Sequence, residues 1–228
     1  MNRTWSESVW EQCLPIFNAI TKHPFIMELA NGSLDAERFN RYLGQDEVYI
    51  GNYGRQMFLL ADRISNPEER EMFRLFAQSG IDGEKAMHQL LISRFGTDTE
   101  VKASVVTTYY NAHTQHAVDN DPVEVALAAM LPCMWIYNRV GLHILSIANL
   151  EGNPYREWIE EYGNEEFTEG VNGVVELIDR WAERVAPEVR SRMTQVYAEA
   201  ALFEYAFWDY GYHGEHKNYD YMKKGLPE

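Results

Sequence analysis

Residues 121–148 read DPVEVALAAMLPCMWIYNRVGLHILSIA and form the most apolar stretch of the 228-residue chain. The stretch opens on Asp121-Pro122, a pairing typical of the start of a helix. Polar residues interrupt it, among them Glu124 and Arg139, which a membrane-spanning segment disfavours. We therefore predict a helix that is buried in the core of a globular protein.

The helical pattern continues outward in both directions from this segment. Apolar residues recur with a period of about 3.6, and no segment shows the sustained alternation of a strand. A second start signal stands at Asn66-Pro67. We expect an all-α protein in which about eight helices with short connections make a single-domain bundle over residues 1–228. The chain from about residue 213 is expected to be a polar tail.

Proline and glycine predict three local irregularities. Pro15 should kink the first helix, because a proline inside a helix clashes with the preceding turn. Gly80 and Gly83 should interrupt the long helix that begins at Pro67. Asn153-Pro154 should open a later helix.

Charge and cysteine content exclude several classes of protein. Twenty basic against thirty-five acidic residues give a formal net charge of −15, which repels phosphate backbones and anionic headgroups, so we expect neither nucleic acid nor membrane as a partner. Two cysteines are too few for a disulfide framework or a thiolate cage. The N-terminus lacks the layout of a signal peptide, and we expect a cytoplasmic protein.

Cys133 is the first candidate for chemistry. It follows Pro132 inside the predicted helix, where a proline bends the backbone and frees a carbonyl group. Cys133 and Tyr137 are four residues apart and share a helix face. A cysteine in an apolar helix is commonly only a small hydrophobic residue, whereas a reactive thiol needs a lowered pKa and access. The residues alone leave both interpretations open.

Two carboxylates occupy apolar helix faces, where an ionised group is costly unless it is paired. Asp46 lies on the stripe that carries Tyr49, whereas the neighbouring Glu47 should point elsewhere and be solvated. Glu204 stands among aromatic residues in ALFEYAFWDYGY, which favours a raised pKa of the kind that a general acid requires. Asp209, five residues further along the same segment, is expected to be a structural or partner carboxylate. A structural salt bridge or hydrogen bond is the alternative for both Asp46 and Glu204.

Tyrosines on four different predicted helices could complete a pocket with these groups. For any one of them, packing in the core is the ordinary explanation. Together with Asp46 and Glu204 they would make a box for a flat heteroaromatic ligand. These four are Tyr49, Tyr110, Tyr137 and Tyr162.

Metal and nucleotide motifs are missing from the sequence. A carboxylate-bridged di-iron bundle needs Glu-x-x-His on two helices, whereas Glu84 and His88 are four residues apart and have no matching second pair. No glycine-rich phosphate loop and no nucleophile elbow is present. We expect no metal site and no cofactor.

Four segments together resemble the TenA/THI-4 family, in its cysteine-containing thiaminase II branch. The Pro-Cys-x-Trp-x-Tyr core and the Glu-Tyr-x-Phe-Trp-Asp ending are the most specific parts of the resemblance, which covers nearly the whole chain. The segments are HPFIMELANGSLDAERFNRYLGQDEVYI (23–50), ALAAMLPCMWIYNRVG (126–141), YREWIEEYGNEEF (155–167) and FEYAFWDYGY (203–212).

The resemblance implies a haem-oxygenase-like helical fold and a homotetramer. It implies a hydrolase that converts 4-amino-5-aminomethyl-2-methylpyrimidine to the hydroxymethyl pyrimidine with release of ammonia, in thiamin salvage, and that also cleaves thiamin. The expected partner is therefore a small aminopyrimidine or thiamin substrate. The resemblance calls for neither an organic cofactor nor a metal.

The resemblance also implies roles for individual residues. Cys133 matches the nucleophile, Asp46 the carboxylate that holds the aminopyrimidine, and Glu204 the acid/base residue. Tyr109 and Tyr155 are nearby alternatives for two of the pocket tyrosines. The tyrosines that match the pocket wall are Tyr49, Tyr110, Tyr137 and Tyr162.

Two other functions fit the same expected fold. One is a haem-oxygenase-like, metal-dependent oxidase that binds iron or a quinone precursor, which would need inward histidine and carboxylate ligands. The other is a non-catalytic regulator or pyrimidine-binding protein, which would have no use for the thiol.

Overall fold

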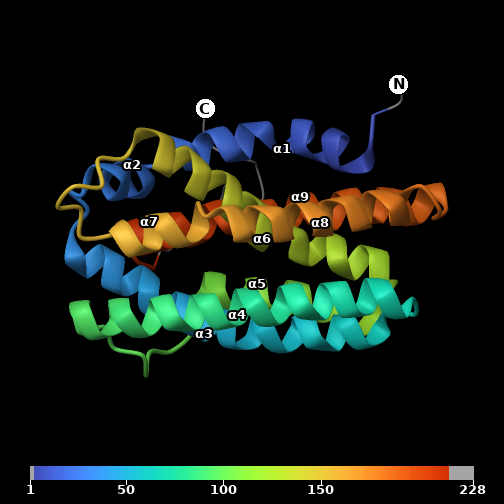
Figure 1. Ribbon diagram of the computed structural model, residues 1–228, viewed down its shortest axis with the longest axis horizontal. Coiled ribbons are helices and arrows are strands. Elements are labelled where there is room, and N and C mark those ends of the chain that lie inside the picture. The colour runs from blue at the N-terminus through green and yellow to red at the C-terminus, as the bar shows by residue number, and fades with distance from the viewer. Residues whose placement is uncertain (1–2, 216–228) are drawn as a thin grey trace.

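Helix α6 (Val123–Ile147) is the apolar stretch that the sequence analysis started from, and it runs through the middle of the computed structural model (Figure 1). Seventeen of its 25 residues are buried. Among the described residues it is the one helix long and apolar enough to cross a membrane. The rest of the protein, however, buries 89% of its most apolar 18-residue segment. It is therefore the core helix of a bundle, as predicted.

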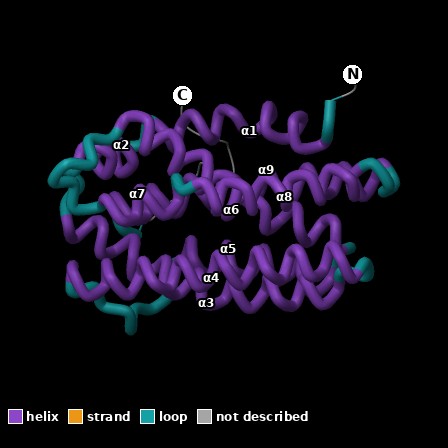
Figure 2. The backbone as a smooth tube through the Cα atoms, viewed as in Figure 1, coloured by secondary structure: helices purple, strands orange, loops and turns teal. Residues whose placement is uncertain are grey.

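The structure describes residues 3–215, of which 82% are helical, and no strand occurs among them (Figure 2). The prediction of an all-α fold is confirmed. Most of the predicted polar tail lies outside the described residues. The remaining helices are α1 (Trp5–Thr21), α2 (Pro24–Asn31), α3 (Ala36–Arg63), α4 (Pro67–Phe95), α5 (Val105–Asn120), α7 (Arg156–Tyr162), α8 (Glu165–Ala182) and α9 (Pro187–His213).

Short polar side chains fix where several of these helices begin. The Asn66 side chain accepts hydrogen bonds from two backbone N–H groups of the first turn of α4, ahead of Pro67. Asp35 and Ser104 accept in the same way at the starts of α3 and α5. Each bond satisfies a backbone donor that has no partner inside the helix. The predicted start at Asn66-Pro67 is confirmed.

The helices lie in three layers, seen edge-on in Figure 1. Helices α1 and α2 form one outer layer, and α3, α4 and α5 form the other. Between them run α6, α7, α8 and α9, with α9 packed along α6 and also touching α1, α3 and α5. This arrangement brings α3 and α4 against the middle layer, where the candidate site residues lie.

Two predicted features of the helices are wrong. Gly80 and Gly83 do not interrupt α4, which is continuous, because neither adopts a positive φ. Asn153-Pro154 does not open α7, which begins at Arg156. The Asn153 amide instead donates to two carbonyls at the end of α2. Pro15 lies within α1, which is assigned as one helix.

Gly141 allows α7 to pack directly on α6. A Cβ atom at this position would lie 2.5 Å from the backbone carbonyl carbon and oxygen of Tyr162. We expect Gly141→Ala to destabilise the fold by about 2 kcal/mol, because overpacking here outweighs the better helix propensity of alanine. Thermal unfolding measures this change. The matched control is Gly173→Ala on α8, where a Cβ meets nothing within 4 Å and unfolding should be unchanged or slightly later. Equal melting temperatures for the two variants would contradict the prediction.

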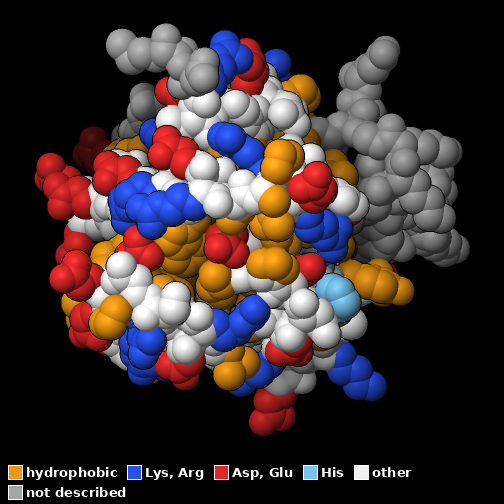
Figure 3. Space-filling view, turned by 90° about the vertical axis from the view of Figure 1, so that its right-hand side faces the viewer, with side chains coloured by type: hydrophobic (Ala, Val, Ile, Leu, Met, Phe, Trp, Pro, Cys, Tyr) orange, Lys and Arg blue, Asp and Glu red, His pale blue; other side chains and the backbone are white. Residues whose placement is uncertain are grey.

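The surface mixes charges of both signs. On the end of the bundle shown in Figure 3, acidic side chains flank the separate groups of basic ones, with apolar side chains between them. This pattern is consistent with the excess of acidic residues and gives no continuous basic face in this view.

Candidate active site

A cavity opens between α3, α4, α6 and α7, next to the first turn of α8. It encloses about 670 Å³ when its open mouth is included. Its wall combines aromatic and aliphatic side chains with three carboxylates and one thiol, the composition expected of a small-molecule site. The lining residues are Asp46, Ile50, Tyr53, Gly54, Met57, Phe76, Gly80, Ile81, Glu84, Cys133, Met134, Tyr137, Glu161, Tyr162 and Phe167.

Cys133 stands in the wall of this cavity, one residue after Pro132 in the core helix. Burial raises the pKa of its thiol well above the usual range, and the nearby Glu204 and Glu84 carboxylates raise it further. The resting form is therefore the neutral thiol. A base must remove its proton before the sulfur can act as a nucleophile.

Asp46 faces the same cavity from α3 and is held by two donors. The Tyr42 hydroxyl donates to Oδ2 over 2.9 Å, and Nε2–H of His88 donates to the same oxygen over 3.2 Å. Trp158 in turn donates its indole N–H to the Tyr42 hydroxyl. Asp46 is only 2% exposed, so these partners replace the water that a carboxylate would otherwise require.

Glu84 is a cavity residue that the sequence analysis considered only as a metal ligand. Its Oε1 accepts a hydrogen bond of 2.5 Å from the Tyr162 hydroxyl. Burial, aided by the charge of Asp46, raises the pKa of Glu84 to about 7. Its position about one turn after Gly80, on a helix of ordinary composition, carried no sign of this role. Only the packing of α4 against α7 reveals it.

Glu204 lies behind the cavity wall with two of the predicted tyrosines. The Tyr110 hydroxyl donates to Oε1 of Glu204, while Oε2 is buried and has no hydrogen-bond partner. Burial raises the pKa of Glu204 to about 8. The Tyr49 ring packs on Tyr110, with centroids 4.8 Å apart. Glu204, Tyr49 and Tyr110 do not line the cavity, but the charge of Glu204 raises the pKa of the Cys133 thiol.

The structure therefore brings four of the seven predicted residues to the cavity and stacks three behind it. Tyr137 and Tyr162 face the cavity, with ring centroids 5.2 Å apart. The alternatives Tyr109 and Tyr155 lie elsewhere: Tyr109 is 62% exposed, and the Tyr155 hydroxyl donates to a backbone carbonyl far from the cavity. The four cavity residues are Asp46, Cys133, Tyr137 and Tyr162.

Glu47 is exposed and does not line the cavity, as predicted, but it also accepts a hydrogen bond of 2.7 Å from Nδ1–H of His88. Asp46 and Glu47 are consecutive on α3, and His88 from α4 reaches both because its ring lies between the two helices. Burial on its own would lower the pKa of His88, but hydrogen bonds and charges from Asp46, Glu84 and Glu47 raise it to about 9.

Two groups of ligand-type side chains come together in the described part of the chain. In the group of Asp46, Glu84 and His88, both ring nitrogens of the histidine donate to carboxylates, so neither presents a lone pair to a metal. This geometry does not fit metal ligation.

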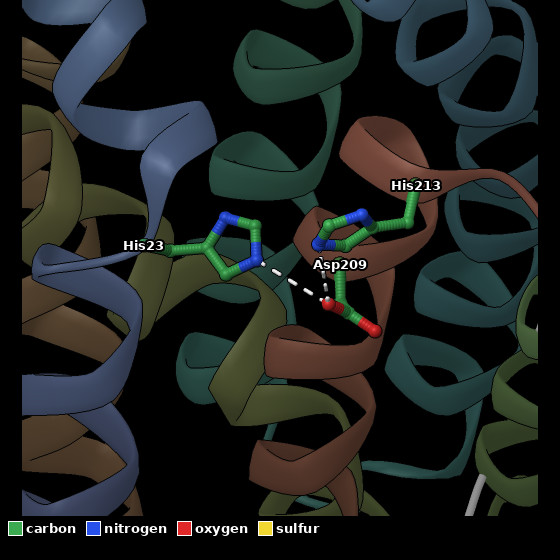
Figure 4. Close-up of side chains that lie close together, drawn as sticks. All are labelled: His23, Asp209 and His213. Atoms are coloured by element: carbon green, nitrogen blue, oxygen red, sulfur yellow. Dashed lines mark hydrogen bonds and ion pairs between the residues drawn. The ribbon is translucent and has the colours of Figure 1, made fainter.

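The second group, shown in Figure 4, joins α9 to the start of α2. Nδ1 of His23 accepts from the backbone N–H of Phe25, so Nε2 carries the proton and points toward Asp209 over 3.4 Å. His213 lies on the other side of this carboxylate, 3.8 Å away. A metal at Nε2 of His23 would need the opposite tautomer. The predicted structural role of Asp209 fits this arrangement.

Fold and site together define an all-helical protein with a buried thiol and two buried carboxyl groups, Asp46 and Glu204, at or beside an aromatic cavity. The sequence profile of the TENA/THI-4/PQQC family matches residues 10–214. The chain belongs to this family.

Relatives and solved structures resemble the chain over nearly its full length. An aminopyrimidine aminohydrolase of Halalkalibacterium halodurans is 24% identical over 95% of this chain and 99% of its own. An aminopyrimidine aminohydrolase of Bacillus subtilis is 28% identical over 85% and 83% of the two chains.

The fold is shared with solved structures of lower sequence identity. A TenA homologue from Pyrococcus furiosus superposes with a TM-score of 0.86 at 21% identity, covering 91% of this chain and 100% of that one. A domain with a haem-oxygenase-like fold from Shewanella denitrificans gives a TM-score of 0.69 at 15% identity, covering 96% and 95%. The predicted haem-oxygenase-like fold is confirmed.

Proposed function

We propose that the protein is an aminopyrimidine aminohydrolase that replaces the amine of 4-amino-5-aminomethyl-2-methylpyrimidine with a hydroxyl group and releases ammonia in thiamin salvage. We further propose that thiamin itself is cleaved at the same methylene carbon. The curated relatives that carry the name aminopyrimidine aminohydrolase support the substrate class. The observation that carries the proposal is a thiol that shares one aromatic cavity with a hydrogen-bonded aspartate.

The cavity suits a flat, amino-substituted ring. Tyr137 and Tyr162 supply aromatic wall, and Asp46 can accept a hydrogen bond from an exocyclic amino group. Apolar side chains such as Ile50 and Met57 exclude water from the remaining wall. A flat ring held by Asp46 would lie within the same space as Cys133.

The reaction needs a nucleophile, a base and then an acid. Glu204 as a carboxylate takes the thiol proton, and the Cys133 sulfur adds to a ring carbon, which moves an electron pair onto a ring nitrogen. That pair returns, the exocyclic C–N bond breaks, and the leaving nitrogen takes the proton from Glu204. The carboxylate then accepts a proton from water as the water oxygen adds to the methylene carbon. The Cys133 sulfur leaves the ring with its bonding electron pair, which restores aromaticity, and takes the proton back from Glu204. The elevated pKa of Glu204, about 8, suits a group that both takes and gives a proton near neutral pH.

An ammonia-release assay with the aminomethyl pyrimidine, run beside intact thiamin, tests the proposed function. We expect stoichiometric ammonia and hydroxymethyl pyrimidine from the first substrate. Absence of both products, in protein that is folded by circular dichroism, would reject the hydrolase.

Two other functions give different outcomes. A metal-dependent oxidase would require bound iron, which metal analysis of the purified protein detects, and the hydrogen bonds of His23 and His88 argue against such ligation. A non-catalytic binding protein would bind the pyrimidine without turnover. The thiol at the cavity wall favours the enzyme over this second alternative.

We also propose that the protein is cytoplasmic and that, as the family resemblance implies, it is a homotetramer. Large apolar side chains remain exposed on the outer layer of the single chain, including Leu75 and Tyr109, each 62% exposed. Light scattering should give about four times the chain mass of 26.5 kDa at micromolar concentration, because burial of such side chains favours association. A mass close to that of one chain would contradict this prediction.

A further inference from the structure

His88 connects the cavity to the outer surface of the bundle. Its side chain is 2% exposed and lies between α3 and α4. On the cavity side Nε2–H donates to Asp46, and on the outer side Nδ1–H donates to Glu47, whose side chain is 43% exposed. Glu47 and His88 also line a shallow groove on the outside of α3 and α4, where Arg55 and Lys85 stand.

The charges that face His88 come from several helices. Helix α3 contributes the two carboxylates that it bonds, and its own helix contributes Glu84, which accepts from Tyr162 of α7. Among the described residues that line the cavity, there are three acidic side chains and no lysine, arginine or histidine. His88 is therefore the nearest cation to the carboxylate of Asp46, although it does not reach the cavity itself.

Building on the proposed function, we propose that His88 is a positioning residue that holds Asp46 as a correctly oriented anion for the aminopyrimidine, and that Glu47 orients His88 from the solvent side. His88 acts through Asp46 and does not touch the substrate. An anionic Asp46 can only accept hydrogen bonds, so it selects a ring that presents N–H donors, such as an amino group, over one that presents a carbonyl. The negative charge of Asp46 opposes ionisation of the Cys133 thiol, and the positive charge of His88 offsets that effect.

The decisive measurement is calorimetric binding of the hydroxymethyl pyrimidine from about pH 6 to about pH 10, a range that brackets the pKa of His88, about 9. His88→Gln leaves a buried carboxylate without its cation, and burial without a cation disfavours the charged form of such a group. We expect affinity to fall at least about tenfold at neutral pH and to recover as the pH rises and Asp46 ionises again. A loss of equal size at every pH, which a purely structural role would give, overturns the proposal.

Two further variants test whether His88 acts through Asp46. Asp46→Asn should weaken binding, and adding His88→Gln to it should weaken binding by less than about twofold more, because coupled residues are not additive. Multiplied losses in the double variant would overturn the proposal. Glu47→Gln should cause a smaller loss with the same recovery at high pH, and it keeps the proposal testable if His88→Gln does not fold. Unchanged binding in Glu47→Gln would then count against the proposal.

A matched control separates this effect from histidine loss in general. His116 is exposed on α5, outside the site, and its Gln variant should bind like wild type at every pH. Binding to the wild-type protein separates the proposed function from the proposed role of His88. If wild type binds neither the aminomethyl nor the hydroxymethyl pyrimidine, the proposed function fails. If wild type binds and His88→Gln matches it throughout, only the role of His88 fails.

Discussion

Replacing Cys133 with serine should reduce ammonia release by at least about a thousandfold while leaving the fold intact. Serine has nearly the same shape, so the helix around Pro132 should keep its packing. An alcohol, however, is a much poorer nucleophile than a thiolate, and Glu204 cannot ionise it near neutral pH. Initial rates measured beside thermal melts and pyrimidine binding give the test. Binding should persist because Asp46 and the tyrosines are unchanged.

Cys13 provides the matched control for this experiment. It is also a buried cysteine within a helix, and burial raises the pKa of its thiol to about 11. It lies on α1 and does not line the cavity. Cys13→Ser should therefore retain wild-type turnover. Full activity in Cys133→Ser would reject nucleophilic catalysis by this thiol, and equal losses in both variants would point to a structural effect.

The fold could be predicted because its signals are local. The apolar run of α6 and the cap at Asn66-Pro67 each depend on residues close together in the chain. The errors arose where contacts between residues far apart in the chain determine the local structure. The Asn153 side chain donates to the end of α2 and accepts from the backbone N–H of Tyr155, so it does not cap α7. Helix α4 continues through Gly80 because the helix penalty of a single glycine is modest.

The site could be predicted in part for the same reason. Asp46 and Glu204 stood out because each is a carboxylate on an apolar stripe, a conflict visible in the sequence. Glu84 and Glu47 carried no such clear conflict, since polar and apolar residues are mixed around both and neither lies on an unbroken apolar stripe. Their importance comes from what α3 and α4 place opposite them. The sequence spacing of Glu84 and His88 suggested only a metal ligand pair, and hydrogen bonds across helices show why that interpretation does not fit.

Replacing Glu204 with glutamine should make the protein both slower and more stable. Turnover should fall by about a hundredfold to a thousandfold, because glutamine can neither take the thiol proton nor give one to the leaving amine. In wild type, kcat/KM should rise as Glu204 ionises around pH 8, and this acidic limb should disappear in the variant. The Tyr110 hydroxyl can still donate to the amide oxygen, so the local packing should survive.

The stability gain follows from the direction of the pKa shift. Burial raises the pKa of Glu204 from 4.5 to about 8, so between these values the native state keeps a proton that the unfolded state loses. The free energy of unfolding therefore decreases as pH rises through this window, by a few kcal/mol in all. Glutamine does not titrate, and the variant escapes that loss. Its melting temperature should exceed that of wild type by a margin that grows from about pH 4.5 to about pH 8.

The exposed Glu176 on α8 gives the control, and Glu176→Gln should leave the pH dependence of unfolding unchanged. A margin for Glu204→Gln that stays constant with pH would show that the native carboxyl is ionised throughout this range. That result would contradict the raised pKa of Glu204 and the acidic limb of kcat/KM expected around pH 8. A growing margin together with lost turnover would mean that Glu204 is kept at the expense of stability, for the chemistry of the site.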